Sequence, residues 1–181
     1  WDEGITVDDE GLYSATPEAL ADRIALDARG VVIDGTCGVG SIALALARRP
    51  EVTRVVAVDL DAARLAMARH NAGVYGVADR ITFVHDDVAN MLTHERADHL
   101  VLDPPWGGRD YDRSRTTLAD LGLDLRPLLA RFSGPVTLKL PRSFDALELG
   151  EGWHPEPAID ERGVVKMLIA RRSRAPAAQF G

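Results

Sequence analysis

The chain has 181 residues, 46% of them hydrophobic, and a formal net charge of −7 at neutral pH. This size and composition suit one soluble α/β domain, and no apolar run approaches the roughly 18 residues that a membrane-spanning helix needs. The acidic balance argues against a broad phosphate-binding face but leaves room for a local one. The chain has two short basic clusters, which have two alternative interpretations: a surface that binds nucleic acid, or ordinary solvated surface. The first cluster is Arg109, Arg113 and Arg115, and the second is Arg171, Arg172 and Arg174.

Cysteine content and the first residues indicate the cellular location. Cys37 is the single cysteine, and residues 1–4 lack the basic and apolar regions of a secretory signal. We therefore expect a reducing, cytoplasmic environment and no membrane partner. Trp1 is not an initiator residue, so we expect further chain to precede it. We expect one domain over residues 1–174 and a flexible tail over 175–181.

Thr16 and Pro17 predict a helix with Thr16 as its N-cap that runs to about Ala28. After it, short apolar runs alternate with amphipathic ones. The predicted strands are 31–34, 54–59, 81–84, 98–103 and 134–140, and the predicted helices are 41–49, 61–73 and 118–132. This alternation predicts a parallel sheet with right-handed crossovers. Two extended stretches, 152–160 and 163–171, predict an antiparallel hairpin at one edge.

A glycine-rich turn joins the first predicted strand to the helix over 41–49. Such a turn lets backbone approach a ligand closely and aims a helix N-terminus at it. The spacing Gly38-x-Gly40-x-x-Ala43, with Asp59 at the end of the next strand, satisfies the dinucleotide-binding pattern. An NAD- or flavin-dependent enzyme is therefore one interpretation.

Asp34 favours a different cofactor. An acid at the mouth of the helix N-terminus repels a pyrophosphate but can bind the ammonium of S-adenosylmethionine. Asp59 then binds the ribose hydroxyls, and Asp87, after the third strand, lies where an adenine amine can donate. The ordinary alternative makes Asp34 and Asp87 helix caps and the glycines turn residues.

The run Asp103-Pro104-Pro105-Trp106 follows the fourth predicted strand and can clamp a planar amine. The prolines fix φ and lack N–H groups, so the chain is stiff there and its carbonyls face outward. Asp103 and a proline carbonyl can accept from the amine, while Trp106 offers a face for stacking. This geometry predicts methyl transfer to nitrogen by in-line displacement, with catalysis by orientation, desolvation and the Asp103 carboxylate.

These motifs resemble the class I S-adenosylmethionine-dependent methyltransferases, and within them the trimethylguanosine synthase type, the RNA cap guanine-N2 methyltransferase family. The matching runs include Thr-Pro-Glu at 16–18, Asp-Gly-Thr-Cys-Gly-Val-Gly at 34–40 and Asp-Pro-Pro-Trp-Gly-Gly-Arg-Asp-Tyr at 103–111, and further matches lie at 56–61, 68–72, 74–79 and 140–142. The resemblance implies an α/β, Rossmann-like fold whose seven strands follow the order 3-2-1-4-5-7-6. The sheet is mostly parallel, with an antiparallel strand from the C-terminal hairpin. It also implies that Trp106 stacks on the methyl-accepting guanine.

One position departs from the family pattern, which has serine before the two prolines where this chain has Asp103. With Asp103 the run also resembles the Asp/Asn-Pro-Pro-aromatic motif of adenine-N6 and ribosomal guanine-N2 methyltransferases. We therefore predict an S-adenosylmethionine-dependent N-methyltransferase that acts on an exocyclic amine of a nucleobase in RNA, guanine N2 first and adenine N6 second. The alternatives are a small-molecule N-methyltransferase, an NAD-type oxidoreductase and a silent partner subunit. The sequence does not indicate an oligomeric state.

The predicted site residues fall into three groups. The catalytic residues are Asp103, Pro104, Pro105 and Trp106, and the substrate-binding residues are Trp106, Arg109, Tyr111 and Arg142. The cofactor-binding residues are Thr16, Asp34, Gly35, Thr36, Cys37, Gly38, Gly40, Asp59, Leu60, Asp86, Asp87, Val88 and Asp103.

The loop over 109–111 is a candidate lid, with a plain connector as the alternative. Cys37 invites a nucleophile interpretation, but a lone buried thiol is more commonly a small hydrophobe. The five histidines lack ligand spacing, so we predict no metal site.

Overall fold

The computed structural model describes residues 4–107 and 114–173. The chain divides into two compact units, the first ending at Val101 and the second beginning at Leu102. One domain over residues 1–174 stays a prediction, and the tail predicted over 175–181 lies outside the described residues.

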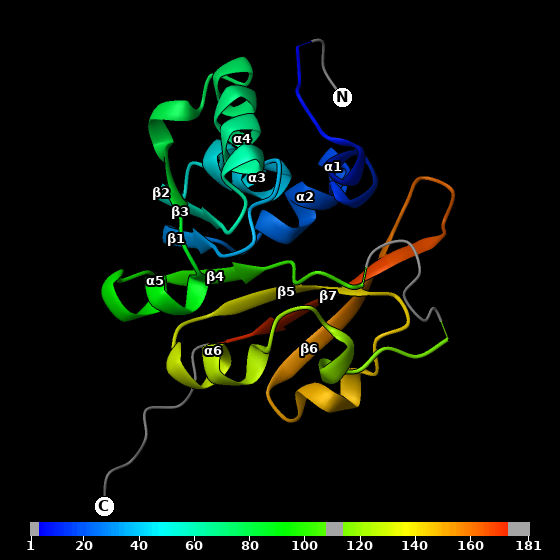
Figure 1. Ribbon diagram of the computed structural model, residues 1–181. Coiled ribbons are helices and arrows are strands. Elements are labelled where there is room, and N and C mark those ends of the chain that lie inside the picture. The colour runs from blue at the N-terminus through cyan, green and yellow to red at the C-terminus, as the bar shows by residue number, and fades with distance from the viewer. Residues whose placement is uncertain (1–3, 108–113, 174–181) are drawn as a thin grey trace, which may run out of the picture. The chain divides into compact units, whose positions relative to one another are not determined.

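The first unit alternates helices with parallel strands (Figure 1). Its elements are α1 (Asp9–Ser14), α2 (Glu18–Ala25), β1 (Gly30–Asp34), α3 (Ser41–Arg48), β2 (Val52–Asp59), α4 (Ala62–Val74), η1 (Ala78–Arg80), β3 (Ile81–His85), α5 (Val88–His94) and β4 (His99–Leu102). The strands lie in the order β3-β2-β1-β4, and all their pairings are parallel. Their carboxyl ends therefore share one edge, where Asp34 pairs with Val101 and Asp59 pairs with His85.

Apolar burial explains why these segments adopt their structures. Residues 55–58 of β2 are all buried, which is typical of a parallel strand covered on both faces. α3 buries residues 42–47 and packs on β1, β2 and α2. α2 buries Leu20 and Ile24, which lie one helical turn apart on the same face.

Asn71 of α4 fastens the segment before α1 to the first unit, and its side chain is fully buried. Thr6 N donates to Oδ1 of Asn71 at 2.8 Å, while Nδ2 donates to the carbonyl oxygens of Thr6 and Val39, each at 2.9 Å. His70 Nε2 lies 2.8 Å from the carbonyl oxygen of Gly4. Because Val39 belongs to the glycine turn, Asn71 connects that turn to the N-terminal segment.

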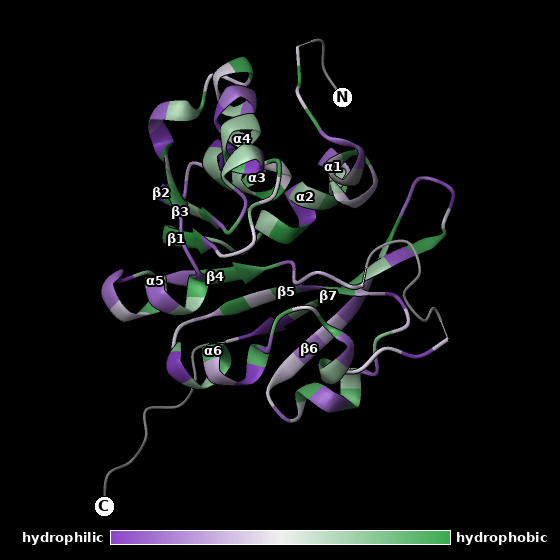
Figure 2. Ribbon diagram, in the orientation of Figure 1, coloured by the Kyte–Doolittle hydropathy of each residue, from purple (hydrophilic) through white to green (hydrophobic). Residues whose placement is uncertain are grey.

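The second unit combines short helices with an antiparallel arrangement of strands. Its elements are η3 (Leu118–Asp120), α6 (Leu125–Arg131), β5 (Val136–Pro141), η4 (Ala146–Leu149), β6 (Trp153–Ile159) and β7 (Val165–Arg172). β7 pairs antiparallel with both β5 and β6. All six residues of β5 are buried, whereas β6 is mainly exposed and hydrophilic (Figure 2) and includes Pro155 and Pro157.

The complete strand order is β3-β2-β1-β4-β5-β7-β6 in one seven-stranded sheet. This order confirms the predicted α/β, Rossmann-like class I methyltransferase fold, mostly parallel with an antiparallel strand from the C-terminal hairpin. In the described ranges 4–107 and 114–173, no helix combines the length and the apolar character needed to cross a bilayer.

The helix predicted from Thr16 to Ala28 is wrong at both ends. Pro17 is the N-cap, with a ψ of 143° that is extended rather than helical, so α2 begins at Glu18. It ends at Ala25, three residues earlier than predicted. Thr16 therefore does not cap this helix.

The helix predicted over 118–132 is wrong as one continuous element, because it consists of η3 and α6 with an irregular stretch between them. Gly122 lies in that stretch and donates its N–H to the carbonyl oxygen of Pro105 at 2.7 Å. This long-range bond replaces the local one that a continuous helix requires. The short elements α1, α5, η1 and η4 were not predicted.

Candidate active site

The glycine turn runs from Gly35 to Gly40, between β1 and α3. Gly38 and Gly40 have φ values of 55° and 98°, in the left-handed region that glycine adopts without strain. Gly40 is the N-cap of α3 and contributes no side chain to it. A Cβ atom at Gly38 would meet no heavy atom within 4 Å, so the backbone there borders open space. A ligand can therefore approach this backbone closely.

Asp34 is the last residue of β1, and its side chain is fully buried. The interpretation of Asp34 as a helix cap is wrong, because Gly40 holds the N-cap position of α3. Burying a carboxylate costs several kcal/mol unless positive or hydrogen-bonding groups accompany it. An acid retained next to the glycine turn fits a ligand that carries an ammonium group.

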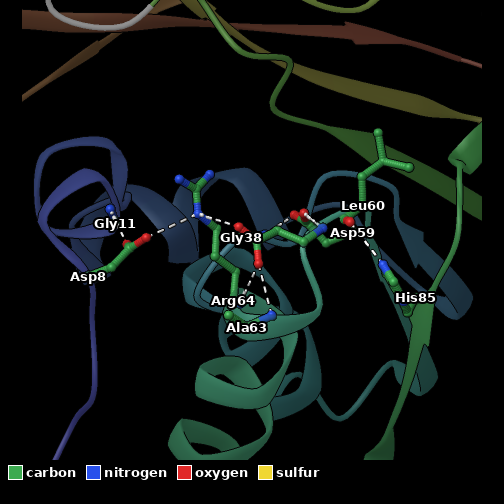
Figure 3. A network of polar contacts seen from close by, with 9 residues as sticks. Asp8, Gly11, Gly38, Asp59, Leu60, Ala63, Arg64 and His85 are labelled. Atoms are coloured by element: carbon green, nitrogen blue, oxygen red, sulfur yellow. Dashed lines mark hydrogen bonds and ion pairs between the residues drawn. The ribbon is translucent and has the colours of Figure 1, made fainter.

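Asp59 ties the glycine turn to the start of α4 (Figure 3). Its Oδ2 accepts from Gly38 N at 2.6 Å, and its Oδ1 accepts from Asp61 N at 2.9 Å. Asp61 then caps α4 by accepting from the backbone of Ala63 and Arg64 at 2.8 and 3.2 Å. Each carboxylate oxygen has two acceptor sites, so Asp59 can hold the turn and still accept from ribose hydroxyls.

Arg64 extends this network toward α1. Its Nε lies 3.3 Å from Oδ2 of Asp8 and 3.7 Å from Oδ2 of Asp61. Asp8 caps α1 by accepting from Gly11 N at 2.6 Å, and this bond, with help from Arg64, lowers the pKa of the Asp8 carboxyl. The N-terminal helix is thus fastened next to the carboxylates that follow β2.

Leu60 lies between Asp59, the last residue of β2, and Asp61, and 70% of its surface is exposed. Its carbonyl oxygen is 2.9 Å from Nε2 of His85, while its side chain points away from the polar network (Figure 3). An exposed apolar group at this edge of the sheet suits contact with a flat base. The assignment of Leu60 to the cofactor stays a prediction.

Asp86 and Asp87 follow β3 and organise the start of α5. Asp87 is the N-cap of α5 and accepts from Ala89 N at 2.7 Å, as the ordinary alternative expected. Asp86 accepts from Asn90 Nδ2 at 3.0 Å and from Asp87 N at 2.7 Å, and these bonds lower its pKa. Val88 is the first residue of α5 and is buried. Contact of this group with adenine stays a prediction.

Cys37 and Thr16, two further predicted cofactor residues, are both buried. Burial raises the pKa of the Cys37 thiol well above its ordinary value of 9.0, and the charges of Asp34 and Asp59 raise it further. The thiol is therefore protonated at neutral pH, and a thiol is a poor nucleophile compared with a thiolate. Because the charges of Asp34 and Asp59 both act on the thiol, Cys37 lies near these two predicted cofactor residues.

The groups along this edge match the chemistry of S-adenosylmethionine. A buried acid precedes an open glycine turn, a second acid is the last residue of β2, and two more follow β3. An ammonium, ribose hydroxyls and an adenine amine are the donors that such a series of carboxylates accepts. The residues present therefore fit this cofactor.

The second unit contains the run of residues 103–106, which we call the acceptor corner. Lys139 of β5 places Nζ 2.6 Å from Oδ2 of Asp103 and 4.8 Å from the centroid of the Trp106 ring. The side chains of Lys139 and Asp103 are 4% and 19% exposed. Burial raises the pKa of the Asp103 carboxyl, and Lys139 opposes that rise. The acid is thus held as one half of a buried ion pair.

Gly122 fixes the second proline of the acceptor corner. Its N–H donates to the carbonyl oxygen of Pro105 at 2.7 Å, and a Cβ atom on it would approach the Pro105 ring to 3.0 Å. Only glycine allows this close approach without displacement. Among the described residues no backbone N–H donates to the Pro104 carbonyl, so Pro104 is the proline whose carbonyl suits a substrate amine.

The other predicted substrate residues give less information. Arg142 follows β5 and is exposed, whereas Arg109 and Tyr111 lie outside the described residues, as does the loop predicted to be a lid. Arg171 pairs with a glutamate of β6, and Arg172 donates to two backbone carbonyls. These two arginines therefore have structural partners.

In the part of the chain that the structure describes, no cluster of three or more His, Cys, Asp or Glu side chains could hold a metal ion.

Sequence reasoning missed Lys139, the residue that joins Asp103 to Trp106. A charged residue in the apolar run Val-Thr-Leu-Lys-Leu was the available signal, because parallel strands at the centre of such sheets are apolar throughout. It also missed Asn71 and Arg64, whose partners lie far away in the sequence.

Comparisons with known proteins agree with the cofactor chemistry of these residues. A family model described as RNA cap guanine-N2 methyltransferase matches residues 29–150. Trimethylguanosine synthase from Schizosaccharomyces pombe is 32% identical over 168 residues, which cover 82% of this chain and 68% of that protein. The chain belongs to the RNA cap guanine-N2 methyltransferase family. It is therefore an S-adenosylmethionine-dependent methyltransferase. Of the two cofactors that the glycine turn could accept, membership of the family favours S-adenosylmethionine over a dinucleotide.

Two further comparisons agree with this family. A protein of Mycobacterium tuberculosis named as an uncharacterized S-adenosylmethionine-dependent methyltransferase is 36% identical over 162 residues, covering 87% of this chain but only 43% of that protein. The crystal structure of an RNA methyltransferase from Salinibacter ruber, in complex with S-adenosyl-L-homocysteine, matches with a TM-score of 0.60 at 23% identity. It covers 92% of this chain and 97% of that one, and it supports the fold.

Proposed function

We propose that this chain transfers a methyl group from S-adenosylmethionine to an exocyclic amine of a purine in RNA, with guanine N2 as the acceptor. The acceptor corner carries this proposal, because Lys139 contacts both its carboxylate and its aromatic ring, and Gly122 fixes Pro105 next to the Pro104 carbonyl. Membership of the family supports guanine N2. Adenine N6 is a second candidate, favoured by Asp103 in the position where the family pattern has serine.

The cofactor supplies an electrophilic methyl group when it is bound. In this proposal Asp34 holds its ammonium, Asp59 its ribose hydroxyls and the residues after β3 its adenine. Val101 of β4 pairs with Asp34 of β1, and Asp103 follows Val101 by only two residues along the chain.

The acceptor corner orients the amine. Asp103 accepts one amine N–H and the Pro104 carbonyl accepts the other, which directs the nitrogen lone pair away from the base plane. As positive charge develops on nitrogen, the carboxylate stabilises it. Trp106 stacks on the base and excludes water from one of its faces. Catalysis then requires no covalent bond to the protein, in agreement with the protonated Cys37 thiol.

Labelled methyl transfer tests the proposal. The protein is incubated with methyl-labelled S-adenosylmethionine and with bulk RNA, DNA or single nucleosides, and the products are digested and identified by mass spectrometry. N2-methylguanosine from RNA supports the proposal, and N6-methyladenosine supports the second candidate. Label only in DNA or only in free nucleosides would overturn it.

Asp103→Ala tests the mechanism. We expect turnover to fall by about 100-fold or more, as when one donor of a preorganised charge-stabilising site is removed. Binding of S-adenosylhomocysteine should change far less. Asp124→Ala is the matched control, because Asp124 is an acid of the same type that caps α6 by accepting from Arg126 N at 3.1 Å. Equal turnover in Asp103→Ala and the control would remove Asp103 from the mechanism.

A further inference from the structure

The peptide group between Leu60 and Asp61 is hydrogen-bonded through both of its polar atoms. Its N–H donates to Oδ1 of Asp59 at 2.9 Å, and its carbonyl oxygen lies 2.9 Å from Nε2 of His85 (Figure 3). A carbonyl oxygen only accepts hydrogen bonds, so Nε2 of His85 carries the proton and donates it. His85 is therefore a donor to the turn that follows β2.

The strand register brings His85 to this turn. His85 is the last residue of β3 and pairs with Asp59, the last residue of β2. Because the two parallel strands end at the same level, a side chain at the end of one reaches the turn after the other. Asp59 also accepts from Gly38 N at 2.6 Å. The bonds thus connect the glycine turn, through Asp59 and the peptide after Leu60, to the end of β3.

These bonds restrain the direction of the Leu60 side chain. A peptide with both polar atoms bonded does not rotate without losing a bond, and its rotation changes ψ of Leu60 and φ of Asp61. The side chain of Leu60 is 70% exposed and points away from the polar network (Figure 3). Backbone hydrogen bonds rather than side-chain packing therefore fix where this apolar group points.

Such a restraint serves a ligand more than the fold. An exposed side chain adds little to the stability of the unliganded protein. A ligand that meets a contact surface already held in place loses less conformational freedom on binding, and this preorganisation increases its affinity. The adenine of S-adenosylmethionine is a flat base that suits an apolar contact of this kind.

We propose that His85 is a positioning residue for the cofactor, which holds the Leu60 side chain against the adenine by fixing the peptide after Leu60. The inference rests on the proposed function, since that function places the adenine at this edge of the sheet. His85 acts through Leu60. A role of His85 in the fold alone would make its effect on cofactor binding independent of the side chain at position 60.

A double-mutant cycle separates these two roles, with affinity for S-adenosylhomocysteine measured by isothermal titration calorimetry. His85→Phe keeps a planar ring but removes the donor, and it should weaken binding about fivefold. Leu60→Ala should weaken binding about tenfold. The double variant should match Leu60→Ala, at about tenfold, whereas independent effects would give about 50-fold. His154→Phe is the matched control, because His154 is an exposed histidine of β6 in the second unit. It should keep the wild-type affinity.

His85→Gln tests the donor itself, because its amide nitrogen also donates and reaches about as far along the side chain as Nε2 does. This variant should bind within about twofold of wild type. Wild-type affinity in His85→Phe, an additive loss in the double variant, or no recovery in His85→Gln would each overturn the inference. Wild-type affinity in Leu60→Ala would overturn it together with the placement of the adenine. Failure of the proposed methyl transfer is a separate result, namely absence of label in RNA, and does not depend on these affinities.

Discussion

Asn71→Ala should destabilise the protein by about 3 kcal/mol, because it removes three hydrogen bonds from a fully buried side chain. The carbonyl of Val39 lies at a buried contact and loses its bond to Nδ2, which costs about 2 kcal/mol. The two groups of Thr6 are partly accessible to water, so each adds about 0.5 kcal/mol.

Urea denaturation measures this change as a shift of the midpoint at unchanged slope. Asn90→Ala is the control, because Asn90 is exposed and its side chain donates to Asp86, so its loss should cost less than about 0.5 kcal/mol. Asn71→Ala should also weaken binding of S-adenosylhomocysteine, since Val39 belongs to the glycine turn. A loss below about 1 kcal/mol for Asn71→Ala would refute the reasoning that Asn71 joins the N-terminal segment to the turn.

Two further predictions concern the glycine turn. Gly40→Ala should cost about 3 kcal/mol and weaken cofactor binding, because a Cβ there combines a φ of 98° with a contact of 3.1 Å to the Cβ of Ala68. Gly76→Ala, at a φ of 67° with no heavy atom within 4 Å, should cost only about 1 kcal/mol when both variants are compared by urea denaturation, and equal losses would contradict the argument. The raised pKa of Cys37 means that its contribution to stability is complete below its ordinary pKa of 9.0 and is lost above it. Relative to Cys37→Ala, the wild-type protein should therefore lose up to about 1.4 kcal/mol per pH unit above that value in urea denaturation, and a difference independent of pH would be the contrary result.

The strands could be predicted because their signals are local. Apolar runs ending in an acid, such as the one that ends at Asp59, mark buried parallel strands without knowledge of any partner. The strand order came from the resemblance to a family rather than from periodicity. The glycine turn was also recognisable, because its spacing has a direct conformational reason at Gly38 and Gly40.

The failures have a common cause in contacts between distant residues. Gly122 interrupts a helix because its N–H goes to Pro105, and nothing near position 122 indicates this partner. Lys139 contacts Asp103 across 36 positions of sequence. Its presence in an apolar strand was a signal, but the chemistry of that signal depended on what lies opposite, which only the folded chain reveals.

Strand β6 ends the sheet, and two of its residues, Pro155 and Pro157, pair with Ala170 and Leu168 of β7. Proline has no N–H to offer, and within sheets it is found at borders where that side faces solvent. The outer rim of β6 is therefore a poor template for another extended chain. Replacing both prolines with valine would add two backbone donors to β6 and make this rim a better template for edge-to-edge pairing.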